Sequence, residues 1–128
     1  MKITAFDPVI VTAKVDDTMK VFEALGFEKR HAPTNSINDS DVTSNRLKHE
    51  NGYHVDVVAV EQEMPRDLTL IRMNVDDFDE TYQILLNHGF KNQQGDEISE
   101  TESSKTTTMV SPSGFMIGLT QHKKKQEN

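Results

Sequence analysis

Two side chains near the middle of the chain could bind a metal ion or transfer a proton. His54 and Asp56 lie two positions apart in an extended aliphatic segment, so in a strand both would point to the same face. Imidazole and carboxylate groups are metal ligands and general acids or bases. Further along, Arg72 carries a guanidinium that can hold a carboxylate through two hydrogen bonds. On a solvent-facing strand the same residues would only contact water or a neighbouring strand. Whether they form a site therefore depends on the strands and helices that position them.

Composition and motifs exclude several other kinds of site. The chain has no cysteine, which rules out thiolate nucleophiles, cysteine-bound zinc and disulfides. It lacks the glycine-rich, serine-elbow and zinc-helix motifs of nucleotide-binding proteins, hydrolases and metalloproteases. A formal charge of −7 works against binding to nucleic acid phosphates. No apolar run approaches the roughly 20 residues that span a bilayer, so we expect a cytoplasmic protein with no membrane partner.

The chain contains the same pattern twice. In each copy an apolar segment runs into an Asp pair, followed by an apolar stripe at helical spacing, a glycine and a phenylalanine. The copies occupy residues 15–27 and 75–90. The glycines that end the helices, Gly26 and Gly89, are 63 residues apart, and the turn glycines, Gly52 and Gly114, are 62 apart. Two independent spacings therefore indicate an internal repeat within one domain.

Each copy predicts a strand, a helix and three further strands. In the first copy the strands cover residues 3–11, 27–32, 42–50 and 53–61, and the helix covers 15–25. In the second copy the strands cover residues 68–75, 90–92, 105–111 and 115–121, with a helix that starts near Phe78 and ends at His88-Gly89. Asn51-Gly52 and Pro112-Ser113-Gly114 predict hairpin turns. The polar stretches 33–41 and 95–104 predict loops, and Thr12 or an Asp of the first pair should cap the first helix.

This tandem βαβββ pattern resembles the vicinal oxygen chelate superfamily. The resemblance rests on the Val-Asp-Asp helix starts, the Leu-Gly-Phe helix exit at residues 25–27 and the Pro-Ser-Gly-Phe-Met-Ile-Gly-Leu segment at residues 112–119, and it extends to about His122. The superfamily includes glyoxalase I, bleomycin-resistance proteins, fosfomycin-resistance enzymes and extradiol dioxygenases. The resemblance implies an α+β fold in which two modules, about residues 1–62 and 67–122, form curved mixed sheets around a shared cleft, often in a homodimer. Residues 123–128, with their lysine run, should form a solvated polar tail.

The resemblance also implies where metal-using members carry their ligands. One position lies seven residues before the second Asp of the pair, and the other lies four residues after the hairpin glycine. In the second copy these positions hold Leu70 and Gly118, which have no side-chain donor atom.

In the first copy half of such a site remains. Asp56 stands four residues after Gly52, with His54 on the same face. The first-strand position is Asp7 if the copies are aligned on Leu-Gly-Phe, and Ile10 if they are aligned on Val-Asp-Asp. The remaining histidines, His31, His49, His88 and His122, are expected at the surface.

The sequence therefore favours a metal-free, bleomycin-resistance-like protein that sequesters a small, partly apolar molecule in the cleft. The expected ligand-binding residues are Asp7, His54, Asp56, Arg72, Met116 and Gly118, with no catalytic residue assigned. One alternative is a glyoxalase- or dioxygenase-like lyase or isomerase with a non-standard divalent metal site at Asp7, His54 and Asp56. A second alternative is a non-catalytic scaffold or regulatory dimer. Nothing in the sequence identifies the ligand.

Overall fold

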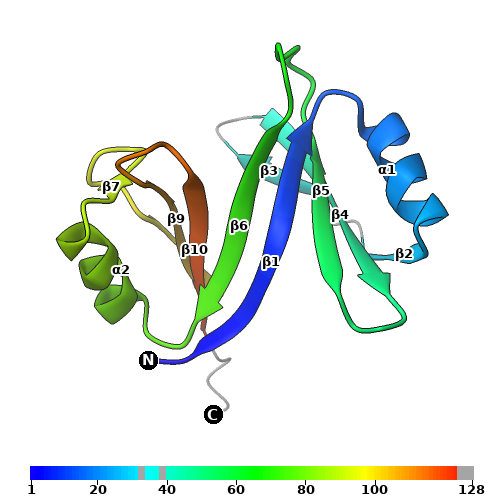
Figure 1. The fold of residues 1–128 in the computed structure, drawn as a ribbon. Coiled ribbons are helices and arrows are strands. Elements are labelled where there is room, and N and C mark those ends of the chain that lie inside the picture. The colour runs from blue at the N-terminus through cyan, green and yellow to red at the C-terminus, as the bar shows by residue number, and fades with distance from the viewer. Residues whose placement is uncertain (32–33, 38–39, 124–128) are drawn as a thin grey trace. The chain divides into compact units, whose positions relative to one another are not determined.

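The chain forms two compact units, each with one helix beside a sheet (Figure 1). The computed structural model describes the backbone of residues 1–31, 34–37 and 40–123. The N-terminal unit comprises Asp7–Thr69, and the C-terminal unit comprises Leu70–Asn128 together with Met1–Phe6. The division falls slightly later than the start of the second module predicted at about residue 67, and the first six residues group with that module. In the described residues, no helix is long and apolar enough to cross a membrane.

In the N-terminal unit, helix α1 (Val15–Ala24) lies on one face of a sheet with strand order β2-β4-β5-β1 (Figure 1). Strands β1 and β5 run parallel, β4 is antiparallel to both β5 and β2, and β3 pairs with β4. The strands are β1 (Ile3–Thr12), β2 (Phe27–His31), β3 (Thr34–Ile37), β4 (Ser40–His49) and β5 (His54–Ala59).

The core of this unit lies between the sheet and α1. Its fully buried members are Leu47, Val55 and Val57, from two neighbouring strands. The predicted apolar stripe of the helix packs on them, together with residues from β1 and β2: Val15, Met19, Phe22, Ile10 and Phe27. Alternation along each strand sends every second side chain into this core and the others to the opposite face.

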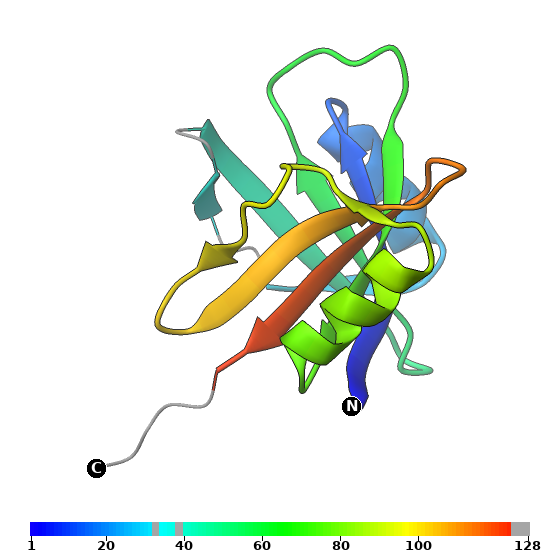
Figure 2. The same ribbon diagram turned by 90° about the vertical axis from the view of Figure 1, so that its left-hand side faces the viewer.

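The C-terminal unit repeats the arrangement, with α2 (Phe78–Asn87) lying across β10 (Figure 2). Its strand order is β6-β10-β9-β7, β8 pairs with β9, and β6 and β10 run parallel. The buried core consists of Met73, Val75, Phe78, Ile117 and Leu119. The strands are β6 (Leu68–Val75), β7 (Lys91–Asn92), β8 (Ser99–Glu100), β9 (Ser104–Val110) and β10 (Met116–His122). The predicted α+β repeat is confirmed.

Two stretches that were predicted as loops contain short strands. Residues 34–37 form β3 and residues 40–41 belong to β4, while residues 33, 38 and 39 of the same predicted loop lie outside the described part of the chain. In the second copy, Ser99–Glu100 forms β8. These segments pair through backbone groups at the edge of a longer strand, which requires no apolar side chains. Hydrophobic periodicity therefore could not reveal them.

The helices start at different points relative to their Asp pairs. Asp77 precedes α2 and caps it, because its Oδ1 accepts a hydrogen bond from the backbone N–H of Glu80 at 3.1 Å. Helix α1 instead starts before its Asp pair, and Lys14 at its N-cap makes no side-chain capping bond. The prediction that Thr12 or an Asp caps α1 is wrong: Thr12 stands two residues before the N-cap Lys14, and its hydroxyl accepts from the N–H of Lys14 itself and not from an N–H of the first helical turn.

This difference settles how the two copies align. The helices start at Val15 and Phe78, and the preceding strands end at Thr12 and Val75, so both pairs are 63 residues apart. The same spacing pairs Asp7 with Leu70. Ile10, the other candidate, packs on the core beside α1. Asp7 is therefore the residue at the first-strand position.

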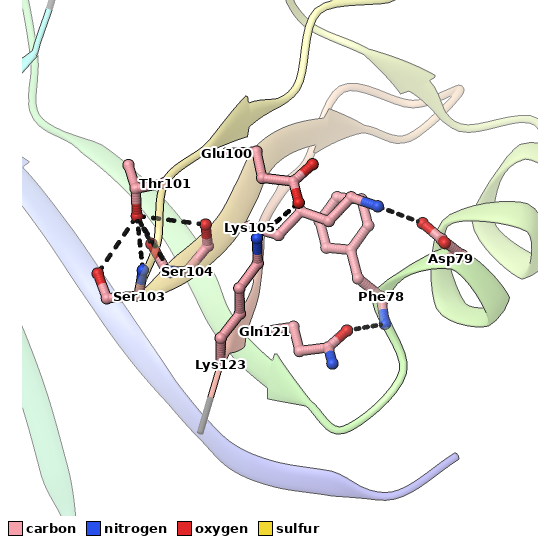
Figure 3. A network of polar contacts seen from close by, with 9 residues as sticks. All are labelled: Phe78, Asp79, Glu100, Thr101, Ser103, Ser104, Lys105, Gln121 and Lys123. Carbon is pink, nitrogen blue, oxygen red and sulfur yellow. Dashed lines mark hydrogen bonds and ion pairs between the residues drawn. The ribbon is translucent and has the colours of Figure 1, made fainter. Parts of the chain in front are cut away.

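A network of polar contacts connects the first turn of α2 to the neighbouring strands (Figure 3). The backbone N–H of Phe78 donates to Gln121 Oε1 at 2.6 Å. Lys105 Nζ lies 2.6 Å from Asp79 Oδ1 and 5.1 Å from the centre of the Phe78 ring. The hydrogen bond with Asp79 raises the pKa of Lys105 above its ordinary value.

A second ion pair of the same network holds the chain after β10. Lys123 Nζ lies 2.6 Å from Glu100 Oε2, and this hydrogen bond lowers the pKa of Glu100 from its ordinary value. Lys123 is therefore not part of a merely solvated tail, contrary to the prediction. Residues 124–128 of that predicted tail lie outside the described part of the chain.

Replacing Lys105 by methionine tests this network. Lys105→Met keeps an apolar side chain over Phe78 but removes the ammonium, so we expect the free energy of unfolding to fall by about 0.5–1.5 kcal/mol. Urea denaturation at neutral pH measures the change. The exposed Lys29 on β2 provides the control, and Lys29→Met should change stability by less than about 0.5 kcal/mol.

The pH dependence of this difference has a definite sign. The folded-state pKa of Lys105 is raised, so its contribution is present at neutral pH and is lost as the pH rises through that pKa. The stability gap between wild type and Lys105→Met should therefore narrow in strongly alkaline buffer. A gap that widened there would contradict this assignment.

Candidate functional site

The candidate residues of the N-terminal unit lie on the face of its sheet opposite α1, which we call the N-terminal helix-free face. The strand register places Val9 and Arg46 on either side of Asp56, and Lys48 beside His54. Asp7 shares this face because it stands two residues before Val9. The helix-free face thus brings together two acidic and three basic side chains: Asp7, Asp56, Arg46, Lys48 and His54.

Two carboxylates of this face are buried. Asp7 is 6% exposed and Asp56 is 5% exposed. Arg46 Nε lies 4.0 Å from Asp56 Oδ1, and the Arg46 side chain is about one-third exposed. Coulomb attraction between a carboxylate and a guanidinium strengthens as water is excluded. The arrangement can accept hydrogen bonds from a ligand or orient a polar group.

Sequence reasoning missed Arg46 because it misjudged the length of the hairpin turn. A two-residue turn at Asn51-Gly52 would place Asp56 opposite Leu47. The actual turn has three residues, since the N–H of His49 donates to the carbonyl of Tyr53 at 2.9 Å and Gly52 has a φ of 94°. Asp56 consequently faces Arg46. The residue Glu50 before Asn-Gly gave no local sign of the longer turn.

The corresponding face of the C-terminal unit, opposite α2, carries the other candidate residues. We call it the C-terminal helix-free face. Strands β6, β10 and β9 place their side chains there in three rows, because partners in the register share a face. The rows are an apolar row of Leu70, Met116 and Val110, a middle row of Arg72, Gly118 and Thr108, and a polar row of Asn74, Thr120 and Thr106.

The two positions at which the superfamily would place metal ligands in this unit form an apolar contact. A Cβ on Gly118 would lie 3.2 Å from Cδ1 of Leu70. The space beside Gly118 that a side chain would fill is therefore occupied by the end of the Leu70 side chain. Arg72 lies beside Gly118 in the register, and the residue as a whole is half-buried.

The residues do not fit the metal site of the superfamily's enzymes. Leu70 and Gly118 offer no donor atom. Among the residues that the structure describes, no group of three or more His, Asp or Glu side chains could hold a metal ion. The alternative set of Asp7, His54 and Asp56 thus does not form a three-ligand site, although all three residues come from the same helix-free face.

The other histidines occupy different environments. His88 and His122 are exposed, as predicted. His49 is half-buried, with its ring centre 5.3 Å from that of Phe27 at 66° and its Nε2 3.0 Å from the position of a Cβ on Gly26. The prediction of a surface role is wrong for His49, which packs where α1 ends. The His31 side chain lies outside the described residues.

Removing Arg46 tests whether Asp56 depends on it. Arg46→Met preserves most of the side-chain volume but leaves the buried carboxylate without this neighbouring charge, so we expect the free energy of unfolding to fall by about 1–2 kcal/mol. The matched control is Arg30→Met on β2, whose ion pair with Glu28 is exposed on both sides. The control should cost less than about 0.5 kcal/mol. Equal losses for the two variants in urea denaturation would argue against the pair.

Comparisons with known proteins find structural similarity. A scan of protein-family models finds no match, and no curated protein matches the chain. Methylmalonyl-CoA epimerase from Mycobacterium tuberculosis has a similar structure, with a TM-score of 0.71 and 16% sequence identity over 96% of this chain and 91% of that one.

Two further solved structures are also similar to this chain. A Streptomyces coelicolor methylmalonyl-CoA epimerase variant in complex with 2-nitronate-propionyl-CoA has a TM-score of 0.67 and 18% identity, covering 94% of this chain and 98% of that one. A glyoxalase/bleomycin resistance protein/dioxygenase superfamily member from Vibrio splendidus 12B01 has a TM-score of 0.58 and 17% identity, covering 94% and 99%. This chain therefore has the α+β fold of the vicinal oxygen chelate superfamily.

Proposed function

We propose that this protein binds a small, partly apolar molecule at its helix-free faces without using the metal site of the superfamily's enzymes. The observation that carries the proposal is the contact between Leu70 and Gly118. Two neighbouring positions that resemblance assigns to metal ligands hold an aliphatic side chain and a residue with no side chain. Such a surface favours apolar ligand atoms over a cation.

The remaining candidate residues are the proposed contacts of the two helix-free faces, each taken by itself. In the C-terminal unit, Arg72 can hold a planar acceptor group of the ligand, and Met116 offers an adaptable apolar side chain. In the N-terminal unit, the proposed contacts are Asp7, His54 and Asp56, which supply acceptors and an imidazole. A few polar groups among apolar ones are typical of sites that orient a small molecule.

The assembly and the compartment are part of the same proposal. We propose a homodimer, in keeping with the superfamily pattern, and a cytoplasmic location, in keeping with the lack of cysteine. Sedimentation at micromolar concentration tests the dimer. A single monomeric species would remove it and leave the binding proposal in place.

An enzyme remains the second candidate because of the buried carboxylate of Asp56. Two of the three solved structures described above are methylmalonyl-CoA epimerases, and a carboxylate beside a guanidinium can act as a general base. An epimerase exchanges the α-proton of its acyl thioester with solvent. Deuterium incorporation from heavy water into methylmalonyl-CoA, abolished in Asp56→Asn, would favour this function over simple binding.

Thermal-shift screening tests the binding function. A ligand of the folded protein raises its melting temperature, so a library of small aromatic and aliphatic compounds should contain hits. In Arg72→Ala, the affinity for such hits should fall by about 10- to 150-fold, which corresponds to the loss of a charged hydrogen bond. The exposed Arg66, replaced in Arg66→Ala, is the control and should leave the affinities unchanged. A library without hits would count against the proposal.

Metal analysis tests the other half of the proposal. Protein purified without chelator should contain far less than one equivalent of zinc, nickel, manganese or iron, and EDTA should leave the thermal shifts produced by library hits unchanged. Stoichiometric metal that disappears in Asp56→Ala would instead show that Asp56 contributes to a metal site.

A further inference from the structure

The polar row of the C-terminal helix-free face is a row of hydrogen-bond acceptors. Thr106, Thr120 and Asn74 lie side by side on β9, β10 and β6. Thr106 and Thr120 are half-buried, and Asn74 is 8% exposed. Which of these groups can donate to a ligand follows from where their protons already point.

The hydroxyl protons of this row are already used. The Thr106 hydroxyl donates to the carbonyl of Leu119 at 3.1 Å, and a hydroxyl has one proton. The hydroxyl oxygens of Thr106 and Thr120 are 2.8 Å apart. Thr120 must therefore be the donor in that bond and Thr106 the acceptor. Both hydroxyl protons are thus engaged, so this pair can offer a ligand only lone pairs, and Thr120, which accepts no hydrogen bond from Thr106, has both of its own available.

Asn74 adds a second acceptor next to Thr120. Its Oδ1 is buried, and among the residues that the structure describes none donates a hydrogen bond to it. A buried carbonyl oxygen without a donor is unfavourable, so a ligand that supplies an N–H or O–H gains free energy there. Thr120 and Asn74 thus favour the same kind of ligand group.

The opposite end of this face favours apolar atoms. Leu70, Met116 and Val110 form its apolar row, and along β10 this row and the polar row are four residues apart. At about 3.3 Å per residue the two rows are about 13 Å apart. Arg72 lies in the row between them, two residues along β6 from Asn74, so the Cα atoms of these two residues are about 7 Å apart and a cationic ligand group at Asn74 would have a residue of like charge as its neighbour.

From this order of rows we infer the class of the ligand. It is an amphipathic molecule about 13 Å long that carries an uncharged hydrogen-bond donor, a hydroxyl or an amide N–H, at one end and an apolar group at the other. Thr120 and Asn74 are the residues that determine specificity for the donor, and Leu70 and Met116 contact the apolar end. This inference rests on the proposed binding function and specifies which molecules the site accepts.

A matched pair of probes tests the inference. para-Pentylphenol and para-pentylanisole share the ring, chain and oxygen, but the anisole carries a methyl group in place of the donated proton. Titration calorimetry with the wild-type protein should show about 10-fold tighter binding of the phenol, the effect of one buried hydrogen bond. Pentylbenzene, which lacks the oxygen, separates the missing proton from the added methyl bulk and should bind no tighter than the anisole.

Two variants test whether the polar row causes the preference for the phenol over the anisole. Thr120→Val removes the acceptor while keeping the shape of the side chain, and the phenol preference should fall to about 2-fold. Thr106→Val leaves Thr120 in place but removes the acceptor of the Thr120 hydroxyl proton, so that Thr120 can donate to a ligand. The preference for the phenol should therefore also shrink. A purely structural role of Thr106 would not give this result. Thr69→Val, at an exposed position of β6, is the control and should retain the wild-type preference.

The outcomes separate the inference from the proposed function. Equal binding of the phenol and the anisole to the wild-type protein would overturn the acceptor row while the binding function stands. Tighter binding of the cation para-pentylbenzylamine than of the phenol would overturn the assignment of an uncharged donor. If none of these probes binds and the compound library also gives no hit, the proposed function itself fails.

Discussion

The organisation of both units depends on the strict alternation of side chains along a strand. Each unit has one helix against its sheet, so only one face can form an apolar core. Leu47 and Val57 point toward α1, and Met73 and Leu119 point toward α2. Along each strand, the residues that alternate with these core residues must then point to the helix-free face. The positions of Asp56 and Arg72 are therefore consequences of core formation as much as of any function.

The sequence predicted most of the fold because its strongest signals are local. Glycine spacing and apolar stripes located both helices and the long strands, and alternation placed His54 with Asp56 on one face. Three features had no such signal: the edge strands β3 and β8, whose pairing uses backbone groups, and the extra residue in the turn before Tyr53. That extra residue decides which strand partner Asp56 meets. Arg46 could not be found without it.

The alignment of the two copies shows a similar limit. Sequence alone left Asp7 and Ile10 as alternatives, because the Asp pairs and the glycines implied different registers. The structure decides the matter through the helix starts: Asp77 caps α2, whereas α1 begins one residue before its Asp pair. The two Asp pairs thus look alike in the sequence but have different structural roles in the two copies. The positions of functional residues in the two copies are therefore better aligned by counting from strand ends and glycines than by counting from the Asp pairs.

The grouping of Met1–Phe6 with the C-terminal unit has a consequence for the order of folding. Lys2 exchanges hydrogen bonds with Asp76, its N–H donating to Asp76 Oδ1 at 2.6 Å and its carbonyl accepting from the Asp76 N–H at 3.0 Å. During synthesis the start of the chain must therefore wait for a partner 74 residues later, and contacts of such long range form slowly. A peptide fused ahead of Met1 would emerge beside the first turn of α2, so its effects on folding would appear in the last-made half of the molecule.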